Sequence, residues 1–366
     1  MREFIPVAKP WLGEKELAYA AECVKTSWIS SIGKYVSQFE EEFAQFCGSR
    51  YGVTTSNGTT ALHLALRSLG VGEGDEVIVP ALTFASTAFA VSYTGAVPVF
   101  AEADVHTWNI DPSKIEERIT AKTKAIIVVH LYGHPADVDP VLEIAQKYNL
   151  KVIEDAAEAH GAEYKGKRVG SLGDVGCFSF YGNKIITTGE GGMLTTDSEA
   201  LVEKARLLRD VAMSPDKRYW HTDIGFNYRL TNLQAAIGVA QLEKIEEIIK
   251  LKRRNAKLYD SLLKDVEGVT LPPEAPWAKS VFWMYSILVD EDFGGNRDSV
   301  MEGLRKKGVD SRPFFYPLHT LPPYATGEKF PVSEDLGKRG INLPSSVTLA
   351  EEEIAYIVDV IKGLKR

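Results

Sequence analysis

The sequence contains only three cysteines, Cys23, Cys47 and Cys177, and they form no Cys-x-x-Cys pair. A sparse, odd number of cysteines argues against a disulfide framework and against a zinc site, so we expect no metal centre. The chain also lacks an apolar run of about 18 residues and an apolar N-terminal segment, so we expect neither a membrane span nor a signal peptide. A reducing cytoplasm is the simplest compartment for such a chain.

Positive charge is not in excess either. The chain has 42 Lys and Arg residues against 50 Asp and Glu residues, which gives a formal net charge of −8. Such a protein has no bulk electrostatic attraction to nucleic acid or to an anionic membrane surface. An anionic substrate would therefore need a local cluster of donors. The length of 366 residues and the hydrophobic content of 45% fit a globular protein of about two domains.

Short apolar segments alternate with helical patterns from residue 51 onward. E-V-I-V-P, K-A-I-I-V-V-H-L and K-V-I-E-D predict strands, whereas T-A-L-H-L-A-L-R-S-L predicts a helix. This alternation predicts an α/β fold with a mostly parallel, buried central sheet and helices on both faces. Beyond about residue 250 the pattern becomes α+β. We therefore expect a large domain over residues 1–245 and a smaller C-terminal domain over residues 246–366.

Three local features are candidates for chemistry. Asp155 ends a buried strand, where it could face a ligand crevice or cap the next helix. Gly58 and Thr59 precede a helix, so their N–H groups, with the Thr60 hydroxyl, form either an anion site or an ordinary cap. Lys184 lies in F-S-F-Y-G-N-K-I-I-T-T-G-E-G-G, between an aromatic strand and a glycine-rich turn. It is either a desolvated nucleophile or a surface lysine.

Together these features match the needs of one cofactor. Pyridoxal phosphate requires an anion site for its phosphate, a carboxylate that keeps its pyridine nitrogen protonated, and a lysine that forms a Schiff base. An aromatic side chain against the cofactor ring is also expected. Phe84, in P-A-L-T-F-A, is the best-placed candidate, although ordinary core packing would also explain it.

Several motifs, in this order, resemble one family. S-N-G-T-T-A-L, V-I-E-D-A-A-E-A-H-G, the segment around Lys184 and G-F-N-Y-R-L-T-N-L-Q-A-A are similar to the sugar-nucleotide aminotransferases of the DegT/DnrJ/StrS type. The resemblance spans essentially the whole chain. It implies an enzyme that uses pyridoxal 5'-phosphate, has the aspartate aminotransferase fold (fold type I) and forms a homodimer with shared active sites.

The resemblance also implies roles for cofactor-binding residues. Lys184 would bond to the cofactor, Asp155 would pair with the pyridine nitrogen, and Phe84 would stack on the ring. Asn227 would reach the cofactor phosphate of the neighbouring subunit. Within the same subunit the phosphate would be held by Gly58, Thr59, Thr60 and Ser179.

Other residues are implied around the cofactor and the substrate. Glu158 would lie near the phenolic oxygen of the cofactor, where many relatives have glutamine, and an ionised carboxylate there would compete with the phenolate. His160 would lie beside the site. Because related dehydratases carry histidine in place of the lysine, Lys184 favours amino transfer over dehydration. The candidate substrate-binding residues are Ser30, His160, Arg229, Arg312, Phe314 and His319. Surface ion pairs would also explain the two arginines, and packing would also explain Phe314 and His319.

The substrate is indicated by two further segments. W-I-S-S-I-G-K-Y-V-S and S-R-P-F-F-Y-P-L-H-T-L-P-P-Y resemble a subgroup that transfers the amino group of L-glutamate to C4 of GDP-4-keto-6-deoxy-D-mannose. Alternatives are a UDP- or dTDP-linked keto sugar aminated at C3 or C4, and another reaction type such as a lyase. A non-enzymatic regulator would need a DNA-binding element, and the sequence has neither a helix-turn-helix extension nor a basic patch.

Overall fold

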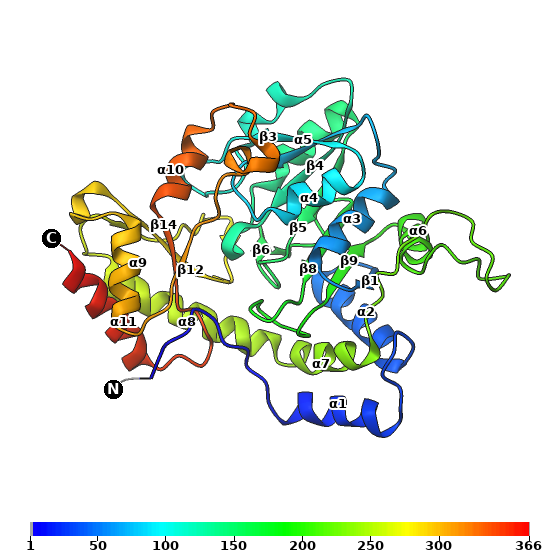
Figure 1. Cartoon of the computed structure of the whole chain (residues 1–366), viewed down its shortest axis with the longest axis horizontal. Coiled ribbons are helices and arrows are strands. Elements are labelled where there is room, and N and C mark those ends of the chain that lie inside the picture. The colour runs from blue at the N-terminus through cyan, green and yellow to red at the C-terminus, as the bar shows by residue number, and fades with distance from the viewer. Residues whose placement is uncertain (1–2, 366) are drawn as a thin grey trace.

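The computed structural model describes residues 3–365, and its largest element is a seven-stranded sheet (Figure 1). The strand order is β1-β9-β8-β5-β4-β2-β3. Neighbouring strands pair in parallel except at β9, which runs antiparallel to β1 and β8. The predicted mostly parallel sheet is confirmed. The strands are β1 (Tyr51–Thr55), β2 (Glu76–Pro80), β3 (Val97–Ala101), β4 (Thr123–Val129), β5 (Lys151–Asp155), β8 (Val175–Ser179) and β9 (Gly192–Thr196).

Helices cover both faces of this sheet, as predicted. Side chains of a strand alternate between faces, so Val77 and Val79 of β2 pack in one core cluster and Ile78 packs in another. The first cluster contains residues of α3, α4 and α6, and the second contains residues of α5. Residues of α2 and α7 share a third cluster with Phe178 of β8. These helices are α2 (Lys34–Cys47), α3 (Gly58–Ser68), α4 (Ser86–Tyr93), α5 (Val138–Tyr148), α6 (Glu199–Arg209) and α7 (Asn232–Leu242).

A smaller sheet forms the C-terminal part, in the order β10-β12-β14-β13. Its strands β12 and β14 bury Ile287, Ile341 and Leu343 against helices α8, α9 and α11. In Figure 1 this part lies on the left, and α1 (Glu14–Lys25) lies at the lower edge. The elements are β10 (Val269–Thr270), β12 (Tyr285–Val289), β13 (Arg312–Pro313), β14 (Gly340–Leu343), α8 (Ile245–Leu263), α9 (Arg297–Lys306), α10 (Pro331–Arg339) and α11 (Glu351–Leu364).

Helix α8 connects the two parts. Its first turns place Ile248 and Ile249 in the core under the large sheet, and its last turns place Tyr259 and Leu263 in the core of the small sheet. A third, three-stranded sheet is made of β11 (Ala278–Lys279), β6 (Glu163–Tyr164) and β7 (Lys167–Arg168). The domain boundary at residue 245 stays a prediction. None of the helices within residues 3–365 combines the length and apolar character needed to cross a lipid bilayer.

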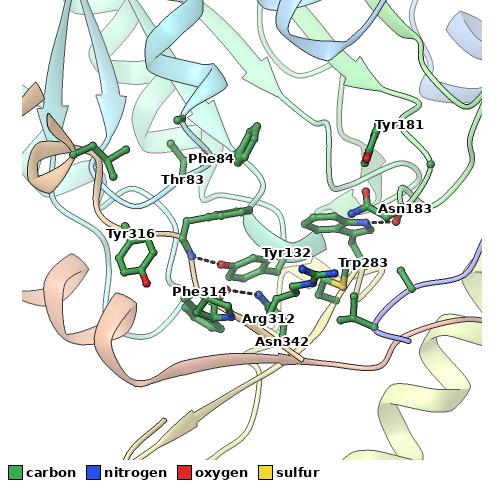
Figure 2. Close-up of a pocket in the computed structure, with 18 of the residues that line it drawn as sticks. Thr83, Phe84, Tyr132, Tyr181, Asn183, Trp283, Arg312, Phe314, Tyr316 and Asn342 are labelled. Atoms are coloured by element: carbon green, nitrogen blue, oxygen red, sulfur yellow. Dashed lines mark hydrogen bonds between the residues drawn. The ribbon is translucent and has the colours of Figure 1, made fainter. Parts of the chain in front are cut away.

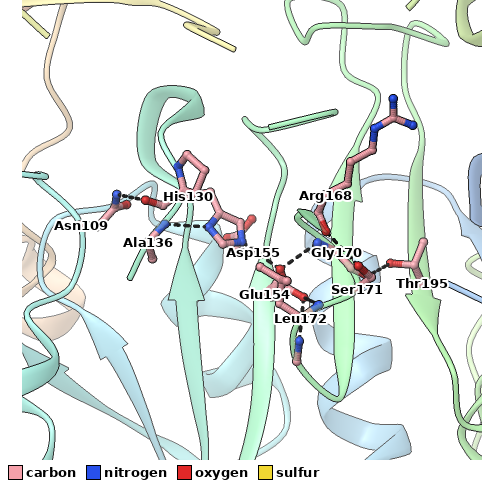
Figure 3. Close-up of polar contacts among 12 residues, drawn as sticks. Asn109, His130, Ala136, Glu154, Asp155, Arg168, Gly170, Ser171, Leu172 and Thr195 are labelled. Atoms are coloured by element: carbon pink, nitrogen blue, oxygen red, sulfur yellow. Dashed lines mark hydrogen bonds and ion pairs between the residues drawn. The ribbon is translucent and has the colours of Figure 1, made fainter. Parts of the chain in front are cut away.

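Below the carboxyl end of β5, a buried polar cluster ties three segments together (Figure 3). Glu154 is fully buried and accepts hydrogen bonds of 2.7 to 2.9 Å from three backbone N–H groups of the 170–173 segment. Nδ1 of His130 accepts the N–H of Ala136, so Nε2 carries the proton and donates to Glu154 Oε2 at 3.1 Å. The next residue, Asp155, is thereby held at a fixed strand end.

We expect Glu154→Ala to lower the free energy of unfolding by about 3–5 kcal/mol, because it leaves several buried donors without an acceptor. Denaturant unfolding of the cofactor-free protein measures this loss. Glu143→Ala is the matched control, since Glu143 is an exposed residue of α5, and its effect should stay within about 0.5 kcal/mol. Equal unfolding midpoints for the two variants would contradict the structural role of Glu154.

Candidate active site

The segment that follows β8 carries Lys184 into a cavity. The N–H of Phe180 donates to the Gly191 carbonyl, and the N–H of Thr188 donates to the Phe180 carbonyl. These two bonds close a loop at the carboxyl end of β8. Within this loop the N–H of Lys184 donates to Tyr181 at 2.9 Å. Lys184 therefore lies on a turn that is anchored at both ends, as its glycine-rich setting indicates.

This cavity has a volume of about 460 Å³ and lies at the carboxyl ends of the parallel strands. Asp155 is the last residue of β5 and Ser179 the last of β8. Besides these two, the structure brings five of the predicted cofactor-binding residues to the cavity wall: Gly58, Thr59, Phe84, Glu158 and Lys184.

The amine of Lys184 lies between an acid and an aromatic ring. Its Nζ is 3.9 Å from Glu158 Oε1 and 3.9 Å from the centroid of the Trp283 ring. Burial lowers the pKa of Lys184, because water no longer stabilises the ammonium form, and the charges of Glu158 and Asp155 partly offset this effect. A lowered pKa favours the neutral amine, which has the lone pair that a nucleophile or a general base needs.

Asp155 is held by two donors. Its Oδ2 accepts the Thr87 hydroxyl at 2.8 Å, and its Oδ1 accepts the N–H of Ala157 at 3.3 Å. Burial raises the pKa of Asp155, and the hydrogen bond from Thr87 acts against that rise. A buried carboxylate held in this way is suited to pairing with a cationic group that enters the cavity.

Glu158 is the second acid of the cavity. Its Oε2 accepts the N–H of Tyr132 at 2.8 Å, which turns Oε1 toward Lys184. Burial raises the pKa of Glu158 to about 7. The carboxyl group therefore changes its protonation state near neutral pH. Competition with the phenolic oxygen of the cofactor would arise only from the ionised form.

The N-terminus of α3 forms one end of the cavity. The first N–H groups of an α-helix have no partner within the helix. The Asn57 side chain accepts the N–H of Thr60 at 2.9 Å, which leaves the N–H groups of Gly58 and Thr59 for an anion. A side chain at Gly58 would place its Cβ 2.7 Å from Ser179 Cβ, so glycine is required for this close approach.

Some predicted residues lie elsewhere. Thr60 does not line the cavity, because its hydroxyl donates to the Asn57 carbonyl at 2.8 Å and completes the cap of α3. His160 is fully buried among Phe43, Phe178 and Phe180, and burial lowers its pKa to about 3, so the ring is neutral.

Four other predicted residues, one cofactor-binding candidate and three substrate-binding candidates, do not line this cavity. Asn227 is exposed, and its neighbour Arg229 forms an ion pair with Asp210. The Ser30 carbonyl accepts the N–H of Asn232 at 2.5 Å. His319 is buried against Phe330, and its Nε2 lies 3.1 Å from Glu334 Oε1.

A second cavity of about 800 Å³ adjoins the first and shares Phe84, Tyr181 and Trp283 with it (Figure 2). Arg312 and Phe314 belong to the wall of this second cavity. Arg312 has only a loose contact with Asp310, 3.4 Å from Nη2 to Oδ2. An exposed guanidinium beside aromatic walls suits an anionic ligand with a flat ring.

Three residues of the site belong to no motif that points to a function: Trp283, Tyr132 and Thr87. Tyr132 follows β4 much as Asp155 ends β5, so the same strand-end argument could have found it. Thr87 lies on α4 and Trp283 precedes β12, and no local spacing connects either residue to Asp155 or Lys184.

The model of the DegT/DnrJ/EryC1/StrS aminotransferase family matches residues 10–362. The chain belongs to this family. It is 49% identical to the GDP-perosamine synthase of Caulobacter vibrioides, over 97% of this chain and 96% of that protein. It is 47% identical to the GDP-perosamine synthase of Escherichia coli O157:H7, over 98% of both chains.

The fold is also that of solved structures in this group. The crystal structure of DesI in the presence of its TDP-sugar product has a TM-score of 0.94 and 30% identity, over 100% of this chain and 94% of that chain. The predicted resemblance and the predicted fold class are both confirmed, and the chain is an aminotransferase.

The raised pKa of Glu158 predicts a pH-dependent stability of the cofactor-free protein. An ordinary glutamate titrates near 4.5, whereas the folded protein keeps this proton up to a pH of about 7. The stability that comes from the protonated carboxyl is complete below the lower value and is lost as the pH rises through the higher one. Glu158→Gln does not titrate, so the unfolding free energy of the natural protein should fall relative to this variant by up to about 3 kcal/mol between about pH 5 and pH 8.

Denaturant unfolding at several pH values measures this difference. Glu143→Gln, at an exposed position, is the control and should leave the pH dependence unchanged. A difference between the natural protein and Glu158→Gln that stays constant over this range would show that Glu158 is ionised throughout.

Proposed function

We propose that this protein uses pyridoxal 5'-phosphate to transfer the amino group of L-glutamate to C4 of GDP-4-keto-6-deoxy-D-mannose, which gives GDP-perosamine. The observation that carries the proposal is Lys184, whose side chain is only 13% exposed, beside Asp155 and Glu158 in one cavity. The sugar is supported by 43–49% identity to three GDP-perosamine synthases. Such biosynthetic chemistry fits the cytoplasm that the sequence analysis favours.

The residues of the cavity fit the cofactor. The free N–H groups of Gly58 and Thr59, with Ser179, would hold its phosphate, and Asp155 would pair with its pyridine nitrogen. The Phe84 ring is exposed at the wall of the cavity and would stack on the cofactor ring. When bound, pyridoxal phosphate supplies a carbonyl carbon that bonds to amines and a ring that accepts electron density.

Lys184 has two tasks in this reaction. It would hold the cofactor through its Nζ, and as a free amine the same Nζ would serve as the general base for the proton at Cα of the amino donor. Burial, which lowers the pKa of Lys184, favours the neutral amine that this role needs. Asp155, fixed by Thr87, would stabilise positive charge at the ring nitrogen and so make that proton more acidic.

The second cavity is our candidate for the nucleotide sugar. Its volume of about 800 Å³ falls in the range of small-molecule sites. Arg312 would contact the diphosphate, and Phe314 contributes to the aromatic wall. The ion pair between Arg229 and Asp210 favours a structural role for that arginine. His319 is likewise engaged, with Glu334.

A homodimer with shared active sites completes the proposal. Asn227 follows a segment with three exposed apolar side chains, Tyr219, Trp220 and Ile224. Such a surface is suited to burial against a second copy of the chain. We propose that Asn227 then contacts the cofactor phosphate of the neighbouring subunit.

Substrate choice tests the function. We expect the cofactor-loaded protein to convert GDP-4-keto-6-deoxy-D-mannose with L-glutamate, and to convert the UDP- and dTDP-linked keto sugars more slowly. Product formation is measured by mass spectrometry, with Lys184→Ala as the inactive control. Preference for a dTDP sugar would favour the alternative that the similarity to DesI raises. Activity of Lys184→Ala equal to that of the natural protein would contradict the mechanism.

Mixing two inactive variants tests the shared site. Lys184→Ala and Asn227→Ala should each lose activity as homodimers. A mixed dimer of the two has one site with both residues intact, so random mixing should restore about a quarter of the natural activity. Each variant mixed with itself is the control. No recovery after subunit exchange, shown by a tag on one chain, would mean that Asn227 acts within its own subunit, whereas full activity of the Asn227→Ala homodimer would mean that it has no part in the site.

A further inference from the structure

A buried lysine, Lys252, lies close to the turn that carries Lys184. Both lysines and Asn183 line one small cavity of about 20 Å³. Lys252 lies on α8, between Ile249 in the core of the large sheet and Ala256 in the core of the small sheet. Lys252 lies at the junction of the two parts and takes no part in the proposed reaction steps.

The ammonium group of Lys252 makes an unusual contact. It donates to the Trp283 carbonyl at 2.7 Å, and within residues 3–365 it forms no ion pair with a carboxylate. Burial lowers the pKa of Lys252 to about 7. A buried amine without an acidic partner is costly, and a methionine would fill the same space without this cost. The hydrogen bond to Trp283 is therefore the property that distinguishes lysine from an apolar residue here.

Trp283 in turn makes two contacts with the segment that carries Lys184. Its indole Nε1–H donates to the Asn183 carbonyl at 2.7 Å, as Figure 2 shows. The face of the same ring lies 3.9 Å from Nζ of Lys184. One side chain thus holds both the backbone next to the lysine and its reactive nitrogen.

The backbone around Trp283 adopts a strained path. Phe282 has a φ of 46°, a left-handed conformation that a bulky side chain rarely adopts. The N–H of Val281 donates to the Gly133 carbonyl at 3.0 Å, and a Cβ at Gly133 would lie 2.8 Å from the backbone nitrogen of Trp283. Such a backbone path needs surrounding contacts to maintain it. Lys252 supplies one of them from helix α8, through its hydrogen bond to the Trp283 carbonyl.

We propose that Trp283 and Lys252 are positioning residues that hold the Lys184 amine at the place where it bonds to the cofactor. Trp283 contacts the amine directly, and Lys252 acts through the Trp283 backbone. The proposal rests on the proposed function, because it concerns the bond between Lys184 and pyridoxal phosphate. It predicts that loss of either residue weakens this bond and leaves the binding of the rest of the cofactor intact.

Two cofactor forms separate these effects. Pyridoxal phosphate can bond to Lys184, whereas pyridoxamine phosphate has an amine in place of the aldehyde and cannot. We expect Lys252→Met and Trp283→Leu to lower the affinity of the cofactor-free protein for pyridoxal phosphate about tenfold, relative to its affinity for pyridoxamine phosphate. Trp283→Phe, which keeps a ring face, should give a smaller loss. Titration calorimetry measures both affinities.

Lys244→Met is the matched control. Lys244 also donates to a tryptophan carbonyl, that of Trp11 at 2.9 Å, and pairs with Glu16. Its replacement should leave the ratio of the two affinities unchanged. If Trp283→Leu fails to fold, Lys252→Met decides, because it keeps the ring.

The outcomes distinguish the positioning role from the proposed function. Equal losses for the two cofactor forms, or no loss for either, in Lys252→Met would overturn the positioning role and leave the proposed function intact. Failure of the natural protein to bind either form would overturn the proposed function and the positioning role together.

Discussion

Burial of one amine beside two carboxyl groups is the constraint on which the rest of this structure depends. Lys184, Asp155 and Glu158 share a single cavity, where burial disfavours the charged form of each group. Each group therefore needs a fixed partner. Thr87 donates to Asp155, the N–H of Tyr132 donates to Glu158, and the Trp283 ring lies against Lys184. Small shifts of the scaffold would change the pKa values on which the chemistry depends.

The fold supplies these partners from distant parts of the chain. Parallel strands bring Asp155 and Ser179 to one edge of the sheet, and glycine at position 58 lets the N-terminus of α3 approach that edge. The hydrogen bonds of Glu154 fix β5 to the 170–173 segment. Helix α8 joins both cores and so relates the small sheet to the cavity, which explains how Trp283 can reach Lys184.

Much of this could be predicted from the sequence, for identifiable reasons. The parallel sheet follows from alternating strands and helices. Asp155 is placed in the site because ligands bind at the carboxyl ends of parallel strands. Glu158 and Ser179 were identified only through the family resemblance. The Trp283 contact and the Thr87 hydrogen bond were not predicted, because they join segments with no common local pattern. Thr60 illustrates the opposite case, since its hydroxyl closes the helix cap instead of facing the cavity.

The most direct test of the central claim is to locate the lysine that bonds to the cofactor. Borohydride reduction of the protein loaded with pyridoxal phosphate, followed by peptide mass spectrometry, identifies that residue. We predict that the added phosphopyridoxyl mass lies on Lys184. The same mass on Lys252 or Lys9, which line a cavity together with Lys184, or on no lysine at all, would contradict the account.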